Sequence, residues 1–258
     1  MERAAVITGA SRGLGLALTR RFLEEGWRVF GISRTERHWK TALKALPSGE
    51  KVSFHRLDLT SELQVKRFAR QILRGQAMGY CLSPEKRESK STQIDLLINN
   101  AGYGGKLLRL ENTPAAGYHK IMSGNLFSTF LMCKYFIPGF REQKKGMILN
   151  ISSMAGQRAV PRVAVYSASK FGVIALSQAI AKENADTGLK CVTVCPGGMN
   201  TEMRAGLFGR KDALKQQTPE FVAGVIFDVY QDKIKVESGG DIVIRHGKIT
   251  AIHPCPGA

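Results

Sequence analysis

Two side chains past the middle of the chain have the types and the spacing for proton transfer. Tyr166 and Lys170 stand four residues apart in a segment with a helical pattern, so their side chains share one helix face. A phenol ordinarily has a pKa of about 10, and a neighbouring ammonium stabilises the phenolate, which brings proton transfer closer to neutral pH. Such a pair is common by chance, so its meaning depends on what accompanies it.

A glycine cluster near the start of the chain accompanies the pair. Gly9, Gly13 and Gly15 stand where an apolar strand gives way to a helix. Glycines at such a junction allow a tight turn, a close approach of a pyrophosphate and close helix packing, and the helix N-terminus offers unpaired amides. The spacing is G-x-x-x-G-x-G and differs from the G-x-G-x-x-G fingerprint. Its position at the first strand-to-helix junction nevertheless predicts a dinucleotide site.

The residues after the second predicted strand favour one nucleotide over the other. An acidic residue there would bind a ribose 2′-hydroxyl, whereas a basic residue suits a 2′-phosphate. The chain has Ser33 and Arg34 at this place, and Arg12 inside the glycine turn is a second cation for the phosphate. We therefore expect NADP(H) in preference to NAD(H). The competing interpretation is that both arginines are ordinary surface cations of a basic protein.

The elements that must position these residues alternate along the chain. Short apolar runs predict strands at residues 4–8, 28–32, 52–57, 94–98, 147–151, 190–194 and 241–244, and amphipathic patterns predict helices at residues 14–25, 61–73, 118–140 and 164–184. Continuous apolar strands that are each followed by a helix indicate a parallel sheet with helices on both faces. The expected fold is α/β, with a doubly wound parallel sheet in three layers of helices, sheet and helices.

The length and composition indicate one domain over residues 1–258. Hydrophobic residues make up 43% of the 258 and charged residues 23%, which is enough for one buried sheet. Residues 75–93 are polar, contain Pro84 and a charge run, and are long for a connection between a helix and a strand. We interpret this segment as an insertion, and the topology predicts that it lies away from the strand ends where ligands bind.

Charge, cysteines and hydropathy exclude several classes of function. The net charge of +17 favours anionic partners in general, but no basic platform with interleaved aromatic residues indicates a nucleic-acid site. The five cysteines lack a Cys-x-x-Cys pair and the histidines lack ligand spacing, so we expect buried free thiols and no metal. No apolar run approaches a membrane span and the chain opens directly on a strand, so we expect a cytoplasmic protein.

Six ordered motifs give the sequence a family resemblance over nearly its whole length. They are Thr8-Gly9-x-x-x-Gly13-x-Gly15, Asp58, Asn99-Asn100-Ala101-Gly102, Asn125, Ser153 with Tyr166-x-x-x-Lys170, and Pro196-Gly197 with Thr201. With these motifs the chain resembles a classical short-chain dehydrogenase/reductase. The resemblance implies a Rossmann-like fold, a nicotinamide cofactor, and hydride transfer between the cofactor and a carbonyl or secondary alcohol.

The resemblance also implies roles for individual residues. Tyr166 would be the general acid/base and Ser153 would hold the substrate oxygen, with Ser152 as the rival serine. Lys170 would grip the nicotinamide ribose, and Asn125 would position a water in a proton relay. The NADP(H) site would comprise Gly9, Ser11, Arg12, Gly13, Leu14, Gly15, Arg34, Asp58, Leu59, Asn100, Ala101, Gly102, Tyr166, Lys170, Pro196, Gly197, Gly198 and Thr201.

The substrate is less well defined by the sequence. A partly apolar pocket is predicted from Tyr103, Leu107, Leu108, Met203, Leu207 and Phe208. It suits a small carbonyl or alcohol, and a 3-oxoacyl thioester is the alternative, although the chain lacks the Val-Asp-Gly-Gly ending that is common in the family. A regulator that binds NADP(H) without catalysis is the alternative from another class. The family implies a homodimer or homotetramer through residues 118–140 and 164–184.

Overall fold

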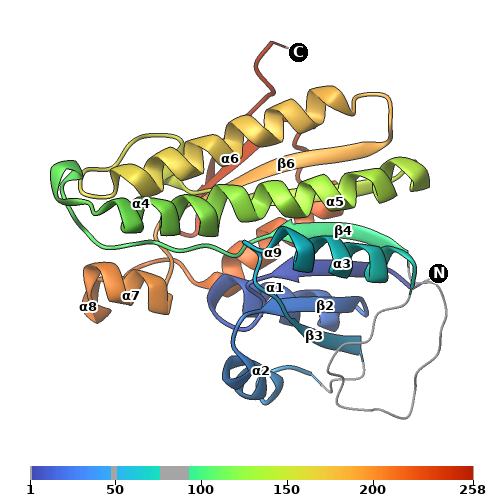
Figure 1. The fold of residues 1–258 in the computed structure, drawn as a ribbon, viewed down its shortest axis with the longest axis horizontal. Helices are drawn as coiled ribbons and strands as arrows, with labels where there is room; N and C mark the ends of the chain where they lie inside the picture. The colour runs from blue at the N-terminus through green and yellow to red at the C-terminus, as the bar shows by residue number, and fades with distance from the viewer. Residues whose placement is uncertain (1, 48–50, 76–92, 258) are drawn as a thin grey trace.

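One eight-stranded sheet contains every strand in the part of the chain that the structure describes (Figure 1). The structure is a computed structural model that describes residues 2–47, 51–75 and 93–257. The strands are β1 (Ala4–Thr8), β2 (Arg28–Ser33), β3 (Val52–Arg56), β4 (Ile94–Asn99), β5 (Gly146–Ile151), β6 (Leu189–Pro196), β7 (Asp241–Arg245) and β8 (Lys248–His253). Their order is β3-β2-β1-β4-β5-β6-β7-β8, and all neighbours are parallel except β7 and β8.

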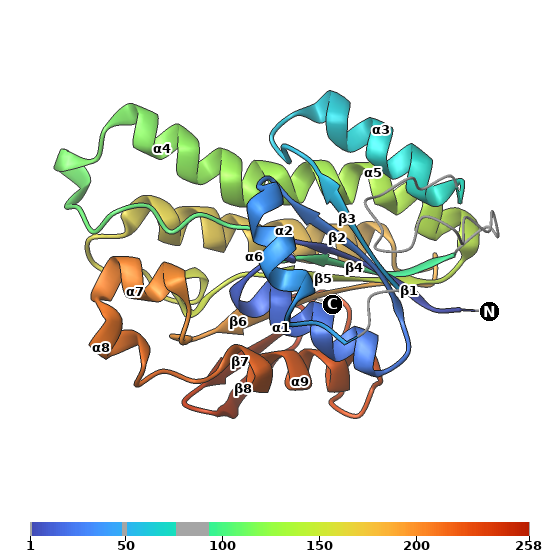
Figure 2. The ribbon, with the colours of Figure 1, turned by 90° about the horizontal axis from the view of Figure 1, so that it is seen from below.

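Helices cover both faces of the sheet, as Figure 2 shows. One face carries α1 (Gly13–Glu24), α2 (Glu36–Leu43) and α9 (Pro219–Tyr230), and the other carries α3 (Glu62–Leu73), α5 (Ser128–Gln143) and α6 (Ala164–Glu183). In the first layer the Phe22 and Phe227 rings lie 5.1 Å apart, and in the second the Phe68 and Phe136 rings lie 6.3 Å apart. The predicted three-layer α/β fold is confirmed.

The strand order places a crevice at the carboxyl ends of β1 and β4. The chain leaves β1 in one direction toward β2 and β3, and in the other toward β4 and β5, so the connections diverge there. The Thr8 hydroxyl accepts hydrogen bonds from the backbone amides of Asn100 and Ala101, each at 2.9 Å. These bonds fix the two strand ends to each other at the edge of the crevice.

Several elements differ from the sequence prediction. The sheet does not end at β7, because β8 pairs with it in antiparallel fashion and forms a C-terminal hairpin. The predicted helix at 118–140 is divided into α4 (Ala115–Met122) and α5 by a π-helical segment at Ser123–Phe127. Four helices were not predicted: α2, α7 (Glu202–Phe208), α8 (Arg210–Ala213) and α9.

Two predictions concern segments that the structure covers only in part. The proposed insertion at 75–93 falls almost entirely on residues 76–92, which lie outside the described residues. Cys133, Cys191, Cys195 and Cys255 are buried and free, as predicted, whereas Cys81 lies outside the described residues. Among the helices of the described segments, none is long and apolar enough to cross a membrane.

His55 of β3 gives the fold a defined response to acid. Its ring packs 5.0 Å from the Phe68 ring, and burial lowers its pKa to about 4. The unfolded histidine binds a proton below about pH 6.5 and the folded one does not, so stability falls as the pH drops from 6.5 toward 4. Between pH 7 and pH 4.5 the free energy of unfolding should therefore fall in the parent protein. In His55→Gln this fall should be about 2 kcal/mol smaller, measured by urea unfolding.

A matched control separates this effect from general acid sensitivity. His119→Gln changes an exposed histidine of α4 and should leave the pH dependence of unfolding as in the parent protein. Identical pH dependence in the parent and in His55→Gln would contradict the role of His55.

Candidate active site

A cavity of about 430 Å³ opens over the carboxyl ends of β1, β2, β4 and β5. One end is formed by the glycine turn between β1 and α1, and the other by Tyr166 and Lys170. The sequence-predicted residues that line it are Gly9, Ser11, Arg12, Gly13, Leu14, Arg34, Asp58, Leu59, Asn100, Ala101, Gly102, Tyr166, Lys170 and Thr201. The glycine motif near the start of the chain and the Tyr166–Lys170 pair past its middle therefore meet in one cavity.

The glycine turn depends on the absence of side chains. Gly9 and Gly13 have φ angles of +67° and +52°, which residues other than glycine rarely adopt. A Cβ atom on Gly15 would collide with the Gly9 carbonyl oxygen and lie 2.6 Å from Asn100 Nδ2. Gly15 does not line the cavity, so its part is to let α1 pack closely against the turn.

Replacing Gly15 should be costly even with the smallest side chain. We expect Gly15→Ala to lower the free energy of unfolding by about 1–3 kcal/mol and to weaken nucleotide binding, because the backbone of the turn must move. Gly224→Ala in α9 is the matched control, since a Cβ atom there meets nothing within 4 Å. Urea unfolding and nucleotide titration measure both effects, and equal stability of the two variants would contradict the packing role of Gly15.

Two arginines and several hydroxyls gather at the β2 end of the cavity. Arg12 and Arg34 are exposed at its surface, and the Ser11 and Ser33 hydroxyls lie 2.9 Å apart beneath them. Thr35 and His38 also line this end. The sequence interpretation missed both, because helix α2, which includes His38 and follows Thr35, was not predicted. This end of the cavity offers cations and hydrogen-bond donors to a phosphate.

Asp58 lines the same end of the cavity from the loop after β3. Its carboxylate accepts hydrogen bonds from the Thr60 amide at 2.9 Å and the Thr60 hydroxyl at 2.8 Å. These bonds lower the pKa of Asp58, and the Arg34 charge adds to the effect. Asp58 therefore presents an ionised carboxylate beside the arginine.

Tyr166 and Lys170 lie on the first turns of α6 and face the other end of the cavity. The Lys170 ammonium is buried, donates a hydrogen bond to the Ile151 carbonyl at 2.8 Å, and lies 5.9 Å from the centre of the Tyr166 ring. Burial lowers the pKa of Lys170 to about 8. Tyr166 and Lys170 thus lie side by side on α6, and both line the cavity.

The pKa of Tyr166 shifts in the direction opposite to the one that the spacing predicts. Burial of the phenol raises its pKa, and a hydrogen bond with Ser153 only partly offsets this. The Lys170 ammonium is turned to the Ile151 carbonyl, so it does not act as the dominant partner of the phenol. In this state Tyr166 is a neutral phenol at physiological pH and holds a proton to donate.

The two rival serines have different surroundings. Ser152 donates a hydrogen bond to the Lys170 carbonyl at 2.8 Å, so its hydroxyl serves to pack β5 against α6. Ser153 caps the short helical turn η4 (Met154–Gly156), where its Oγ accepts from the Ala155 amide at 3.1 Å. Ser153 is also the serine that interacts with the Tyr166 phenol. The effect of Ser153 on the pKa of Tyr166 separates the two serines, whereas Ser152 rather than Ser153 lines the cavity.

Asn125 lies behind the cavity in the π-helical segment. Its Oδ1 accepts from the Tyr103 amide at 2.7 Å, and its Nδ2 donates to the Tyr103 carbonyl and to the Ser169 hydroxyl. The side chain is fully buried and does not line the cavity. Asn125 thus connects Tyr103, in the loop after β4, to Ser169 of α6, which directly precedes Lys170.

Three further predicted residues lie at and just after the end of β6. Pro196 ends β6, Gly197 donates its amide to the Ile244 carbonyl at 2.7 Å, and Gly198 packs against Gln216. None of the three lines the cavity. They lead into Met199 and Thr201, which do, and Thr201 caps α7 by accepting from the Arg204 amide at 3.3 Å.

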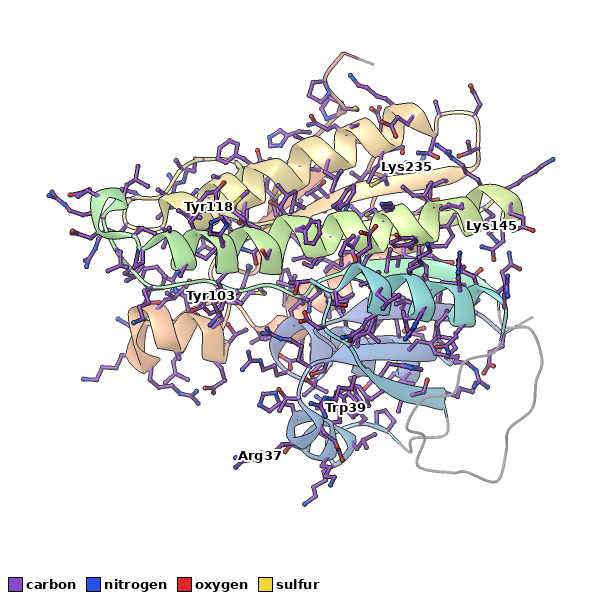
Figure 3. The ribbon with its side chains drawn as sticks, viewed as in Figure 1. Arg37, Trp39, Tyr103, Tyr118, Lys145 and Lys235 are labelled. Carbon is purple, nitrogen blue, oxygen red and sulfur yellow. The ribbon has the colours of Figure 1, made fainter. Side chains whose placement is uncertain are left out.

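Only some of the residues predicted for the substrate pocket line the cavity. Tyr103 lies between α4 and α7 (Figure 3) and lines the cavity with Met203. Leu207 packs toward Gly104. Leu107, Leu108 and Phe208 do not line the cavity, and the Arg204 guanidinium covers the exposed Phe208 ring at 3.8 Å. Lys120, Ser123, Gly124 and Ser128 of the α4–α5 region line the cavity as well, and no motif in the sequence pointed to them.

Comparison with known proteins places this geometry in a family. The sequence model described as short chain dehydrogenase matches residues 3–212. The chain belongs to the short-chain dehydrogenase family. Among curated members it is 32% identical to the 2-(R)-hydroxypropyl-CoM dehydrogenase of Xanthobacter autotrophicus, covering 79% of this chain and 77% of that protein. It is 30% identical to the NADPH-dependent pterin aldehyde reductase of Arabidopsis thaliana, covering 83% and 82%.

Solved structures share the fold. The structure of ElxO with NADP bound superposes with a TM-score of 0.79 at 26% identity, covering 95% of this chain and 96% of that one. Levodione reductase has a TM-score of 0.81 at 24% identity, which shows the fold alone. As a short-chain dehydrogenase the chain is an oxidoreductase, and its curated relatives are named as dehydrogenases and reductases.

Proposed function

We propose that this protein is an NADP(H)-dependent oxidoreductase that transfers a hydride between the nicotinamide and a carbonyl or secondary alcohol. The single observation that carries the proposal is the cavity with two functional ends. At one end it has a glycine turn with two exposed arginines, and at the other the Tyr166 phenol with a buried ammonium. A dinucleotide that spans these ends would bring its reactive ring to the phenol.

The residues at the β2 end fit a dinucleotide with a 2′-phosphate. Gly9 and Gly13 leave room for the pyrophosphate at the N-terminus of α1, and Arg12 and Arg34 would hold the 2′-phosphate. No acidic side chain follows directly on β2, where a 2′-hydroxyl would bind one. The NADP-bound ElxO structure and the NADPH-dependent relative support this choice.

The chain's own residues would supply placement and a proton. When bound, the cofactor supplies or accepts the hydride. In the reductive direction the Tyr166 phenol, kept neutral by burial, donates its proton to the substrate oxygen. Ser153, which interacts with the same phenol, would hold that oxygen, and the Lys170 ammonium would bind the nicotinamide ribose. Asn125 would fix the Tyr103 loop that closes this end.

A homo-oligomer through α4, α5 and α6 is part of the proposal. Tyr118, Phe130 and Phe171 on these helices, and Phe127 of the π-helical segment between α4 and α5, are each 39–45% exposed. The Phe127 and Phe130 rings stack with their centres 6.0 Å apart. A group of exposed aromatic rings is typical of an interface. A second copy of the chain would cover them, and sedimentation at micromolar concentration would report it.

A substrate screen tests the proposed function. NADPH and NADH absorbance would be followed side by side with uncharged ketones, aldehydes, a steroid ketone and a 3-oxoacyl thioester. We expect oxidation of NADPH with at least one carbonyl compound, and much slower oxidation of NADH. Tight NADPH binding with no turnover of any compound would favour the non-catalytic regulator. Absence of NADPH binding would overturn the proposal.

A further inference from the structure

A buried carboxylate of the C-terminal hairpin reaches the loop that carries Ser153. Asp241, the first residue of β7, is buried, and its Oδ1 accepts a hydrogen bond from Gln157 Nε2 at 2.6 Å. The same oxygen accepts from His253 Nδ1 of β8 at 2.9 Å. Gln157 directly follows the turn η4, whose first position is capped by Ser153. One carboxylate oxygen thus joins the edge strand of the sheet to the active-site loop.

The Gln157 amide makes a second contact that leads to Ser153 itself. Its Nε2 lies 3.4 Å from the Cys195 thiol, and that thiol lies beside the Ser153 backbone amide. Burial raises the pKa of Cys195 to about 12, so the group is a neutral thiol. Because a carboxylate only accepts hydrogen bonds, the side-chain NH₂ group of Gln157, and not its carbonyl oxygen, must face Asp241. The same NH₂ group faces Cys195.

The turn between Ser153 and Gln157 has little freedom of its own. A Cβ atom on Gly156 would lie 2.8 Å from the Lys170 backbone, so the turn rests directly on α6. The Gly156 amide donates to the Ser153 carbonyl at 2.8 Å, and the Gln157 amide donates to the Met154 carbonyl at 3.1 Å. A shift of Gln157 is therefore passed to the backbone of Ser153.

We propose that Asp241, supported by His253, is a positioning residue that holds the Ser153 hydroxyl in place through Gln157. Asp241 and His253 lie beyond residues 3–212, where the family model matches. None of Asp241, His253 and Gln157 lines the cavity, so they act through Ser153 and do not touch the cofactor. The catalytic part of this proposal rests on the proposed function, and the geometric part does not.

Loss of the carboxylate leaves polar groups without their acceptor. In Asp241→Ala the half-buried Gln157 amide and the exposed His253 ring lose the oxygen that they share, and the loss of this common acceptor loosens the local arrangement. We expect the turn to move and kcat to fall about tenfold, because a hydrogen bond to the substrate oxygen is then misplaced. The Kd for NADPH should stay within about twofold, since the nucleotide end of the cavity is untouched.

Two readouts test the link. The first is amide hydrogen exchange of residues 153–158 in the nucleotide-free protein, which requires no substrate. The second is kcat, KM and the Kd for NADPH. Asp241→Ala and Gln157→Ala should each speed the exchange about tenfold and lower kcat, and the double variant should be no worse than Asp241→Ala, because both changes break one link. Asp241→Asn restores an acceptor and should recover most of kcat.

Lys248→Ala, an exposed change on the same hairpin, is the control and should alter neither readout. Unchanged exchange, faster exchange with unchanged kcat, or additive effects in the double variant would overturn the proposal. If Asp241→Ala does not fold, Gln157→Ala carries the same test from a half-buried position. Should the screen find no substrate, the exchange data still decide the geometric link, so failure of the proposed function is distinguishable.

Discussion

Replacing Tyr166 by Phe should lower kcat by about 10²–10⁴-fold while NADPH binding is retained, because the change removes the proton donor and leaves the ring in place. The phenol lies at the cavity beside Lys170 and interacts with Ser153. No other described tyrosine combines these contacts. Steady-state kinetics with a ketone from the screen, together with an NADPH titration, measure the two effects separately.

A second tyrosine provides the control for this variant. Tyr135 of α5 donates its hydroxyl to Glu62 at 2.6 Å and does not line the cavity. Tyr135→Phe removes the same atom and should leave kcat within about twofold. If Tyr166→Phe turned over ketones at the parent rate, Tyr166 would not be the general acid.

Replacing Arg34 by Asp should reverse the cofactor preference. The change removes a bidentate partner of the 2′-phosphate and places a carboxylate where a 2′-hydroxyl would bind. We expect kcat/KM for NADPH to fall about 100-fold, which matches the loss of a charged hydrogen bond and added repulsion. The kcat/KM for NADH should stay equal or rise.

The neighbouring arginine separates a specific contact from the loss of general charge. Arg37 is exposed on α2, points away from the sheet in Figure 3, and does not line the cavity. Arg37→Asp makes the same charge change and should alter kcat/KM for NADPH by no more than about threefold, an effect that salt screens. Equal losses in the two variants would show that Arg34 acts only through the net charge.

The sequence predicts the centre of this fold better than its C-terminal part. Buried parallel strands such as β1 and β5 are continuous apolar runs, and they were found within one residue of their predicted bounds. β8 was missed because it is a mostly exposed edge strand with little apolar pattern. α9 was missed because residues 219–230 are apolar on most sides and lack a clear helical period.

The site shows a similar division between local motifs and contacts across the fold. The motif residues Gly9, Arg34, Asp58 and Tyr166 meet in the cavity as predicted. The rise in the pKa of Tyr166 could not be predicted, because it depends on burial and on the direction that Lys170 takes to Ile151. The Asp241 link to Gln157 joins residues 84 positions apart, and no local pattern reveals it.

Transfer of deuterium from NADPH to the alcohol product would demonstrate the proposed hydride transfer. NADPH that carries deuterium on one face of nicotinamide C4 would be incubated with a ketone that the screen identifies, and the alcohol would be analysed by mass spectrometry. We expect one deuterium on the new carbinol carbon from one of the two labelled forms, at a rate that Tyr166→Phe suppresses. Oxidation of NADPH without deuterium in the alcohol from either form would contradict the proposed hydride transfer.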